Sequence, residues 1–276
     1  GLKTVYWSYG AETALADAEV EYNEAHVSQA IYVGFDIDIK TIPSTFKYAS
    51  ELENTKVAIW TTTPWTIPGN LAICLNKEFD YVIAASLDHR KILVAKDLID
   101  SVAKDCKLEL KAITETFKGK ELEGLICRHP LYNRPSPIIF GEHVTIDAGT
   151  GCVHTAPGHG HEDFQIGQQY HLEILCPVDG RGVYTQDSGS YIFKDLSNLE
   201  RAKSRNESLK AKLENLNYQG GRLDFNGFHV IKQGNDLLVA ALFDAGAMLG
   251  LNKLVHSYPY CWRSKTPLLY RATEQW

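Results

Sequence analysis

The sequence has little of several features that would place it in a common class. Its 276 residues include a single methionine, and its six cysteines form no C-x-x-C pair. No run reaches the roughly 18 to 20 apolar residues of a membrane helix. The start, GLKTVYWSYG, lacks an initiator methionine and the basic-then-apolar pattern of a signal peptide. We therefore expect no membrane partner, and the scattered thiols predict a reducing, cytoplasmic compartment.

Both ends of the sequence also lack the usual terminal signals. The chain begins at Gly1 and stops at ATEQW without a turn, a charged tail or a helix stop. We therefore expect a fragment of a longer protein.

The composition excludes wholesale disorder and binding of nucleic acid by bulk charge. Hydrophobic residues make up 44% and charged residues 22%, and the net charge is −6. A chain of this length and composition can bury a sizeable core without disulfides or metals. An acidic balance argues against coating nucleic acid, although it leaves room for a local patch that holds one end of an RNA.

Strand-like runs dominate the first two thirds, so the sequence predicts an α+β fold. Each run is rich in β-branched or aromatic residues and is bounded by turn formers. The sheet is expected to be mostly antiparallel and barrel-like, with helices on one side or end. The runs are Ala30–Ile37, Lys56–Thr62, Tyr81–Ser86, Lys91–Ala95, Leu108–Ile113 and His143–Ile146.

Four segments have helical patterns. Asp97–Asp105 and His161–Tyr170 predict short helices, and Asn235–Gly246 predicts a longer one, capped by its first residue and ended by its last. Asp195–Tyr218 carries mixed charges and leucines at near-helical spacing. An amphipathic surface helix explains that segment without a function; the alternative is a basic face for RNA.

A threonine-rich segment, Trp60–Asn70, is the first candidate for chemistry. It reads WTTTPWTIPGN, and its prolines force the backbone out of a strand ladder. Several hydroxyls are therefore presented where a strand ends, which suits a polar substrate or a bound water. A threonine-rich edge strand followed by a turn would have the same composition.

A glycine- and histidine-rich segment, Asp147–Asp163, is the second candidate, and three kinds of site fit it. A hydrolase triad would pair a serine or Cys152 with His154 and an acid, although no G-x-S-x-G motif is present. A recognition site would bind an ammonium group with Asp163 and use His154 as a wall. A metal site would use His154, His159, His161 and Asp163.

The third candidate is His256–Pro267 together with Arg271–Trp276. Aromatic side chains alternate with Arg and Lys there, a pattern that can stack on bases and contact phosphates. A proline-rich connector with packed aromatics would look similar.

Taken together, these segments resemble the editing insertion of isoleucyl-tRNA synthetases, a class I family. The resemblance extends from about Lys3 to Trp276. It is carried by VYWS with TALADAEVEY, WTTTPWTIPGN, DAGTGCVHTAPGHGHEDF, and HSYPYCWRSKTP with YRATEQW. The HIGH and KMSKS signatures of the synthetic site are absent. The resemblance therefore implies an editing domain that activates no amino acid and needs no cofactor or metal.

The resemblance also implies how the chain is organised. Residues 1–276 would be one editing domain, with 1–30 and 250–276 connecting it to the catalytic domain of the parent synthetase. The stretch 184–220 is longer than usual for the family and is interpreted as an insertion, so it inherits no role.

By the same resemblance, the activity is hydrolysis of valine mistakenly attached to the 3′ end of isoleucine tRNA, with valyl-adenylate as a second substrate. Asp163 would bind the α-ammonium group, and His154 and Trp65 would shape the side-chain pocket. The hydroxyls would position substrate or water, and one amide would support their loop: Thr61, Thr62, Thr63, Thr66 and Asn70.

Weaker candidates for tRNA contact are Trp262, Arg263 and Lys265. The alternatives are a non-catalytic module that only holds the tRNA acceptor end and a metal-dependent hydrolase built on the histidines.

Overall fold

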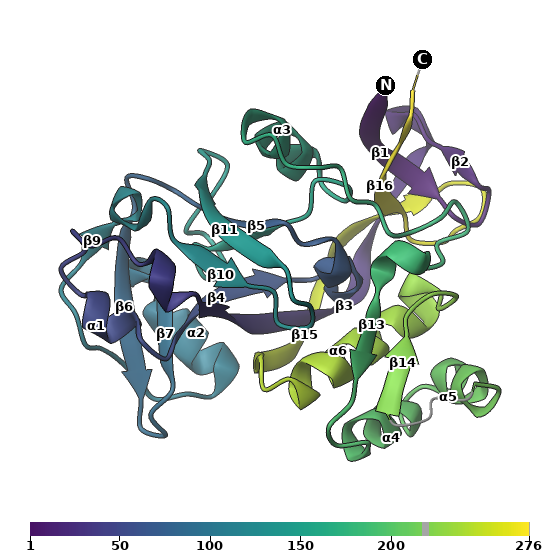
Figure 1. The fold of residues 1–276 in the computed structure, drawn as a ribbon. Coiled ribbons are helices and arrows are strands. Elements are labelled where there is room, and N and C mark those ends of the chain that lie inside the picture. Colours follow the sequence, from purple (N-terminus) through teal and green to yellow (C-terminus); the bar gives the residue numbers. More distant parts are fainter. Residues whose placement is uncertain (217–220, 276) are drawn as a thin grey trace.

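The computed structural model describes residues 1–216 and 221–275, and it shows one large sheet with helices around it (Figure 1). No helix in these residues is long and apolar enough to cross a membrane. The helices are α1 (Ala49–Leu52), α2 (Ile99–Cys106), α3 (His161–Gln169), α4 (Ser197–Lys203), α5 (Glu207–Glu214) and α6 (Asn235–Asp244). The strands are β1 (Leu2–Ser8), β2 (Thr13–Ala14), β3 (Val20–Ile37), β4 (Thr55–Thr61), β5 (Ala72–Leu75), β6 (Asp80–Ser86), β7 (Lys91–Ala95), β8 (Leu110–Ala112), β9 (Phe117–Lys118), β10 (Ile126–Arg128), β11 (Pro135–Phe140), β12 (Val153–Thr155), β13 (Ser190–Ile192), β14 (Arg222–Asp224), β15 (Met248–Cys261) and β16 (Leu269–Glu274).

The main sheet has 11 strands and is mostly antiparallel, which confirms the predicted α+β class. Its order is β15-β3-β10-β11-β5-β12-β4-β7-β6-β8, and β9 pairs with β6. Only β11–β5, β12–β4 and β4–β7 are parallel pairs within the described residues. An additional pairing of β3 with β4 brings the path of strands back to β3, so the sheet curls strongly.

Most predicted strands are present, and one is wrong. The first four predicted runs fall on β3, β4, β6 and β7, and the fifth shortens to β8. The run His143–Ile146 is a loop. β11 and β12 occupy the two edges of β5, so residues 143–146 cannot pair with β5.

The helical predictions hold with two corrections. Asp195–Tyr218 is two helices, α4 and α5, because the Asn206 side chain accepts a hydrogen bond from Leu209 N and starts a new helix. The predicted end at Tyr218 lies outside the described residues. Asn235 does not cap α6, which follows directly on a π-helical turn. Gly246, with φ of +68°, does end that helix.

Two antiparallel ribbons join distant parts of the chain. β3 pairs with β15 over most of its length, and β1 pairs with β16, so the two chain ends lie together (Figure 1). The predicted role of 1–30 and 250–276 as connectors to a catalytic domain stays a prediction.

Two hydrophobic cores, together with a small cluster around Ile139 and Ile166, fill the described part of the molecule. The larger lies within the curled sheet and includes Phe35, Ile59 and Leu93. The second lies beneath α4, α5 and α6, where Leu199, Leu209 and other apolar residues are fully buried. Three leucines of the charged segment, Leu199, Leu209 and Leu213, therefore serve packing, whereas Leu196 and Leu216 are exposed. That 184–220 is an insertion in its family stays a prediction.

Candidate active site

The threonine segment leaves the sheet where β4 ends. Thr61 is the last residue of β4, and its Oγ1 accepts a hydrogen bond from Thr63 N at 3.1 Å. A 3₁₀ turn, Pro64–Gly69, follows, and Thr66 Oγ1 donates to Thr63 O at 2.9 Å. The hydroxyls thus hold the turn in shape. Thr62 alone of the three consecutive threonines has no side-chain hydrogen bond to the described residues, and it is only partly buried.

The histidine-rich segment reaches the threonines through the sheet. β12 lies between β4 and β5, and Val153 is paired with both Trp60 and Cys74. This pairing places His154, the next residue, beside the 3₁₀ turn although the two segments are far apart in the chain.

His154 is held at both ring nitrogens. Asn70 Nδ2 lies 2.8 Å from its Nδ1, and Thr66 Oγ1 lies 3.0 Å from its Nε2. Because an amide nitrogen only donates, Nδ1 accepts and Nε2 carries the hydrogen. Burial, assisted by His159 and Arg134, lowers the pKa of His154 to about 3. The ring is therefore neutral at pH 7, and its lone pair is occupied.

Asp163 lies at the start of α3 and reaches back to the segment before it. Its Oδ2 accepts a hydrogen bond from Ala156 N at 2.9 Å. A Cβ on Gly160 would lie 2.9 Å from the Asp163 carboxyl, so glycine permits this approach. Asp163 has no ion-pair partner in residues 1–216 and 221–275. Burial raises its pKa to about 7 despite that hydrogen bond.

These side chains line one cavity of about 410 Å³, which we call the threonine pocket. Six predicted site residues line it together: Thr61, Thr62, Thr63, Thr66, His154 and Asp163. The remaining lining comes from the glycine-rich loop, from the misassigned loop, from a second carboxylate and from three further residues: Ala148–Val153, His143, Thr145, Glu162, Trp60, Ala156 and His159.

Two predicted substrate residues lie behind this surface. Asn70 is fully buried and contacts His154, so its place suits the predicted supporting role. Trp65 packs its ring against His159, with centroids 4.9 Å apart, and lines a neighbouring hollow. Its backbone is held on both sides, by Asn235 Oδ1 and the Tyr184 hydroxyl.

His159 is a pocket residue that the sequence singled out only as a metal ligand. Its Nδ1 lies 3.0 Å from Tyr270 O, so Nδ1 donates, and the buried Nε2 has no partner in the described part. Burial lowers its pKa to about 4. The sequence offered only its place in the HTAPGHG run as a signal.

Two observations bear on the alternative metal site and the alternative hydrolase triad. Residues 1–216 and 221–275 contain no group of three or more His, Cys, Asp or Glu side chains arranged to hold a metal ion. Burial raises the pKa of the Cys152 thiol well above its ordinary value, so this cysteine is not a thiolate at pH 7.

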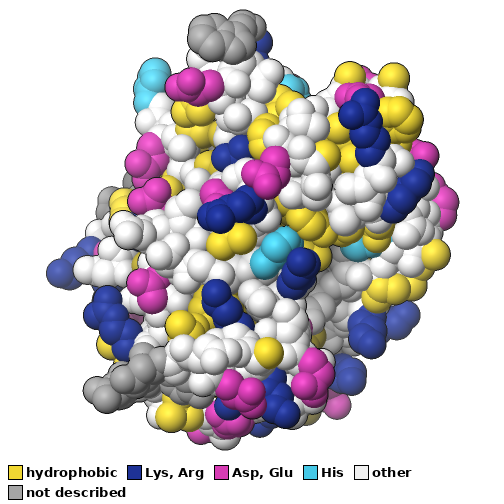
Figure 2. Space-filling model, turned by 90° about the vertical axis from the view of Figure 1, so that its right-hand side faces the viewer, with side chains coloured by type: hydrophobic (Ala, Val, Ile, Leu, Met, Phe, Trp, Pro, Cys, Tyr) yellow, Lys and Arg dark blue, Asp and Glu magenta, His cyan; other side chains and the backbone are white. Residues whose placement is uncertain are grey.

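The three predicted tRNA contacts lie away from the threonine pocket. Trp262, Arg263 and Lys265 follow the end of β15, and none of them lines it. The Arg263 guanidinium lies over the Trp262 ring, and Lys265 forms an ion pair with Glu21 at 2.6 Å. Their role in binding tRNA stays a prediction. On the face seen in Figure 2, cationic and anionic side chains are interspersed.

Comparison with known proteins places this site in a family. The family model described as "Leucyl-tRNA synthetase, editing domain" matches residues 40–195, more than half of the chain. The chain therefore belongs to the family of aminoacyl-tRNA synthetase editing domains.

Within that family, the similarity is to the isoleucine enzymes. The whole chain is 45% identical to the isoleucine–tRNA ligase of Brevibacillus brevis and 46% identical to that of Caldanaerobacter subterraneus. It is 42% identical to that of Acaryochloris marina. The chain spans about a quarter of the length of these relatives, 25%, 26% and 25% respectively. The similarity is therefore to one part of these isoleucine–tRNA ligases.

Among solved structures, the P. knowlesi cytosolic leucyl-tRNA synthetase editing domain aligns with a TM-score of 0.48 and 11% identity. That alignment covers 84% of this chain and 97% of the other.

Proposed function

We propose that this domain hydrolyses valine from the 3′-terminal adenosine of isoleucine tRNA. The observation that carries the proposal is the threonine pocket of about 410 Å³, which is lined by the Thr62 hydroxyl and the Asp163 carboxylate. Neither group has a side-chain hydrogen bond or ion pair to another side chain among the described residues. Valyl-adenylate presents the same ammonium and side chain, and we propose it as a second substrate.

Asp163 binds the α-ammonium group of the amino acid. A carboxylate whose pKa is about 7 is poorly stabilised in the empty pocket. An ammonium group would stabilise its charged form through charge-assisted hydrogen bonds. The hydrogen bond from Ala156 N holds the carboxylate in place for this contact.

The hydrolytic step needs no protein nucleophile. An ester is already an activated acyl group, so a water oriented beside its carbonyl can suffice. Thr62 has a hydroxyl available to hold that water or the substrate. His154 is a poor proton acceptor because its Nδ1 lone pair is occupied and its pKa is about 3. When water adds to the acyl carbon and the bond to the ribose ester oxygen breaks, that oxygen leaves as a hydroxyl and takes up the proton. The neighbouring ribose hydroxyl of the substrate is our candidate for the group that relays this proton.

Selectivity comes from size. Valine and isoleucine differ by one methylene, which changes binding by only about 1–3 kcal/mol; this pair of amino acids is itself the standard example. A second pocket that admits valine and clashes with isoleucine supplies the missing discrimination. The fully hydrogen-bonded His154 ring gives such a pocket one fixed wall.

The parent protein and its partners are part of the proposal. The domain would act within a cytoplasmic isoleucine–tRNA ligase, receiving the 3′ end of the tRNA from the rest of the synthetase. The identity of the relatives supports this placement.

The test is hydrolysis of Val-tRNA by the chain with Asp163→Ala, alongside the exposed Asp97→Ala as a control. We expect the first variant to lose activity while remaining folded, and the second to match the wild type. Full activity of Asp163→Ala would refute the ammonium role. If the wild-type chain bound Val-tRNA but did not hydrolyse it, the proposed function would be refuted. The domain would then be a module that only holds the acceptor end of the tRNA.

A further inference from the structure

The threonine pocket is one end of a longer depression. A hollow of about 210 Å³, the middle hollow, shares the lining residues Thr62 and Thr63 with it. A larger cavity of about 610 Å³, the arginine groove, shares Gln29 and Asp236 with the middle hollow. The three cavities therefore adjoin in series, from α4 to the end of β4.

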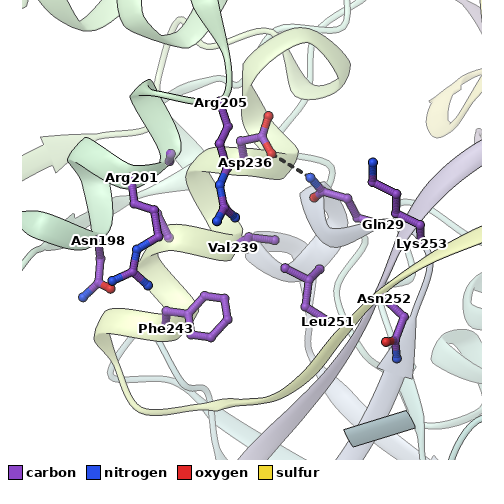
Figure 3. A pocket seen from close by; sticks show the side chains of 12 residues that line it. Gln29, Asn198, Arg201, Arg205, Asp236, Val239, Phe243, Leu251, Asn252 and Lys253 are labelled. Carbon is purple, nitrogen blue, oxygen red and sulfur yellow. Dashed lines mark hydrogen bonds between the residues drawn. The ribbon is translucent and has the colours of Figure 1, made fainter.

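The arginine groove has unpaired positive charge on its rim. Figure 3 shows Arg201 of α4 and Arg205 of the turn that follows α4 reaching over the apolar residues of α6, with Lys253 on the opposite side. None of these three cations has an ion pair among the described residues.

The single carboxylate of the groove does not neutralise the cations. Asp236 accepts hydrogen bonds from Gln29 Nε2 and from Asn206 Nδ2, both at 2.6 Å. Its two oxygens are thus engaged by neutral amides. The groove therefore favours an anionic ligand, and two neighbouring guanidinium groups, one from α4 and one from the turn after it, suit the oxygens of phosphate.

The floor of the groove is apolar and includes an exposed aromatic ring. Val239, Phe243 and Leu251 form it (Figure 3), and Phe243 is 43% exposed. An aromatic ring next to arginines is the usual combination for holding a base and its phosphate in single-stranded nucleic acid. The ligand that fits is a nucleotide unit.

The middle hollow offers a second aromatic wall. His26 and Tyr258 line it and stack with ring centroids 4.3 Å apart. A chain with one charge and one base per unit would meet aromatic surface in both hollows before reaching the threonines. An acidic peptide has charge but no repeating base to stack in each hollow, so the sequence of cavities favours RNA.

We propose that the arginine groove and the middle hollow hold the single-stranded RNA immediately upstream of the terminal nucleotide in the threonine pocket. Arg201 and Arg205 would contact a phosphodiester, and Phe243 would stack on a base. The direction of the RNA, with its 3′ end in the threonine pocket, rests on the proposed function. The groove itself is defined by α4 and α6, outside the segments that carry the family resemblance.

The first test measures binding of a fluorescent single-stranded RNA ending in CCA to the 276-residue chain. Arg201→Gln/Arg205→Gln should weaken binding roughly tenfold and reduce the slope of log K against log salt by about 1.4, as expected for two lost phosphate contacts to a single strand. Phe243→Ala should weaken binding roughly fivefold or more, the loss of about one stacked base.

The matched control is Lys194→Gln/Lys210→Gln, which removes the same charge from exposed positions near α4 and α5 that line none of the three cavities. It should leave affinity within twofold of the wild type. An equal loss in this control would show a general charge effect and overturn the proposal. Absence of RNA binding by the wild type at low salt would overturn it as well.

A second readout separates this proposal from the proposed function. Groove variants should slow hydrolysis of Val-tRNA at low concentration but leave hydrolysis of 3′-valyl-adenosine unchanged, because that compound has no upstream nucleotide. Equal slowing of both substrates would refute the groove. Failure of the wild type to hydrolyse either substrate would refute the proposed function, while the binding experiment would still decide on the groove.

Discussion

Asn70 Nδ2 donates a hydrogen bond to His154 Nδ1 over 2.8 Å, across 84 residues of sequence. The same amide donates to Ala72 O and accepts from Ser136 Oγ. With its acceptor and two donors engaged, Asn70 has one orientation, and it determines the tautomer of the histidine. His154 in turn holds Thr66, so a buried amide sets the geometry of the threonine turn.

Asn70→Ala should destabilise the fold strongly. The substitution leaves buried groups of Ser136, Ala72 and His154 without partners, which costs about 2–4 kcal/mol in the free energy of unfolding. Urea unfolding measures it. Asn215→Ala, which removes an exposed amide at the end of α5, should change stability by less than about 0.5 kcal/mol. Similar losses in the two variants would contradict the buried network.

Asp163→Asn should stabilise the chain at high pH. The pKa of Asp163 is about 7 in the fold against an ordinary value of 3.8, so folding favours its protonated form. The wild type therefore loses stability as pH rises from about 4 to 7, and the uncharged variant escapes that loss. Above pH 7 we expect a gain on the order of 2–4 kcal/mol.

The measurement is thermal or urea unfolding of both proteins at pH 4.5 and pH 8. The two should have similar stability at the lower pH and diverge at the higher one. A difference independent of pH would mean that the carboxyl is not the group that titrates. The variant should also lose hydrolysis of Val-tRNA, which would make Asp163 a residue kept for activity at the expense of stability.

His154→Ala should relax the discrimination between amino acids. Removing the ring widens the threonine pocket, so correctly charged Ile-tRNA should be hydrolysed roughly tenfold faster or more, in line with the overpacking relieved. The comparison is with His161→Ala, an exposed histidine of the same segment that lines no part of this pocket. If a folded His154→Ala protein discriminated between Val-tRNA and Ile-tRNA as the wild type does, the proposed role of the His154 ring in excluding isoleucine would be wrong.

Gly151→Ala and Gly124→Ala form a matched pair for the glycine-rich loop. Both glycines have positive φ, +75° and +89°, so alanine is strained at both. At Gly151 the new methyl group would also collide with Ala95 Cβ, whereas nothing lies within 4 Å at Gly124. We expect a loss of about 1 kcal/mol for Gly124→Ala and at least 1–3 kcal/mol more for Gly151→Ala. Equal losses in urea unfolding would show that the loop yields to the methyl group.

Local patterns in the sequence determined much of this protein. The β-branched runs predicted β4, β6 and β7, because a strand between turn formers needs only neighbouring residues to be recognised. The threonine and histidine motifs marked the residues that line the threonine pocket. The same patterns failed at His143–Ile146, where the choice between strand and loop depended on whether a sheet edge was free.

Only the tertiary structure decided how those residues work. The sequence could not show that the Asn70 amide donates a hydrogen bond to His154 and accepts one from Ser136, since these contacts arise from strand order. Nor could it show that Asp163 has no ion-pair partner in the described part of the chain, because pairing depends on every charge that folding brings near. Local structure follows from the order of residues along the chain, whereas hydrogen-bond partners and burial follow from the order of strands in the sheet.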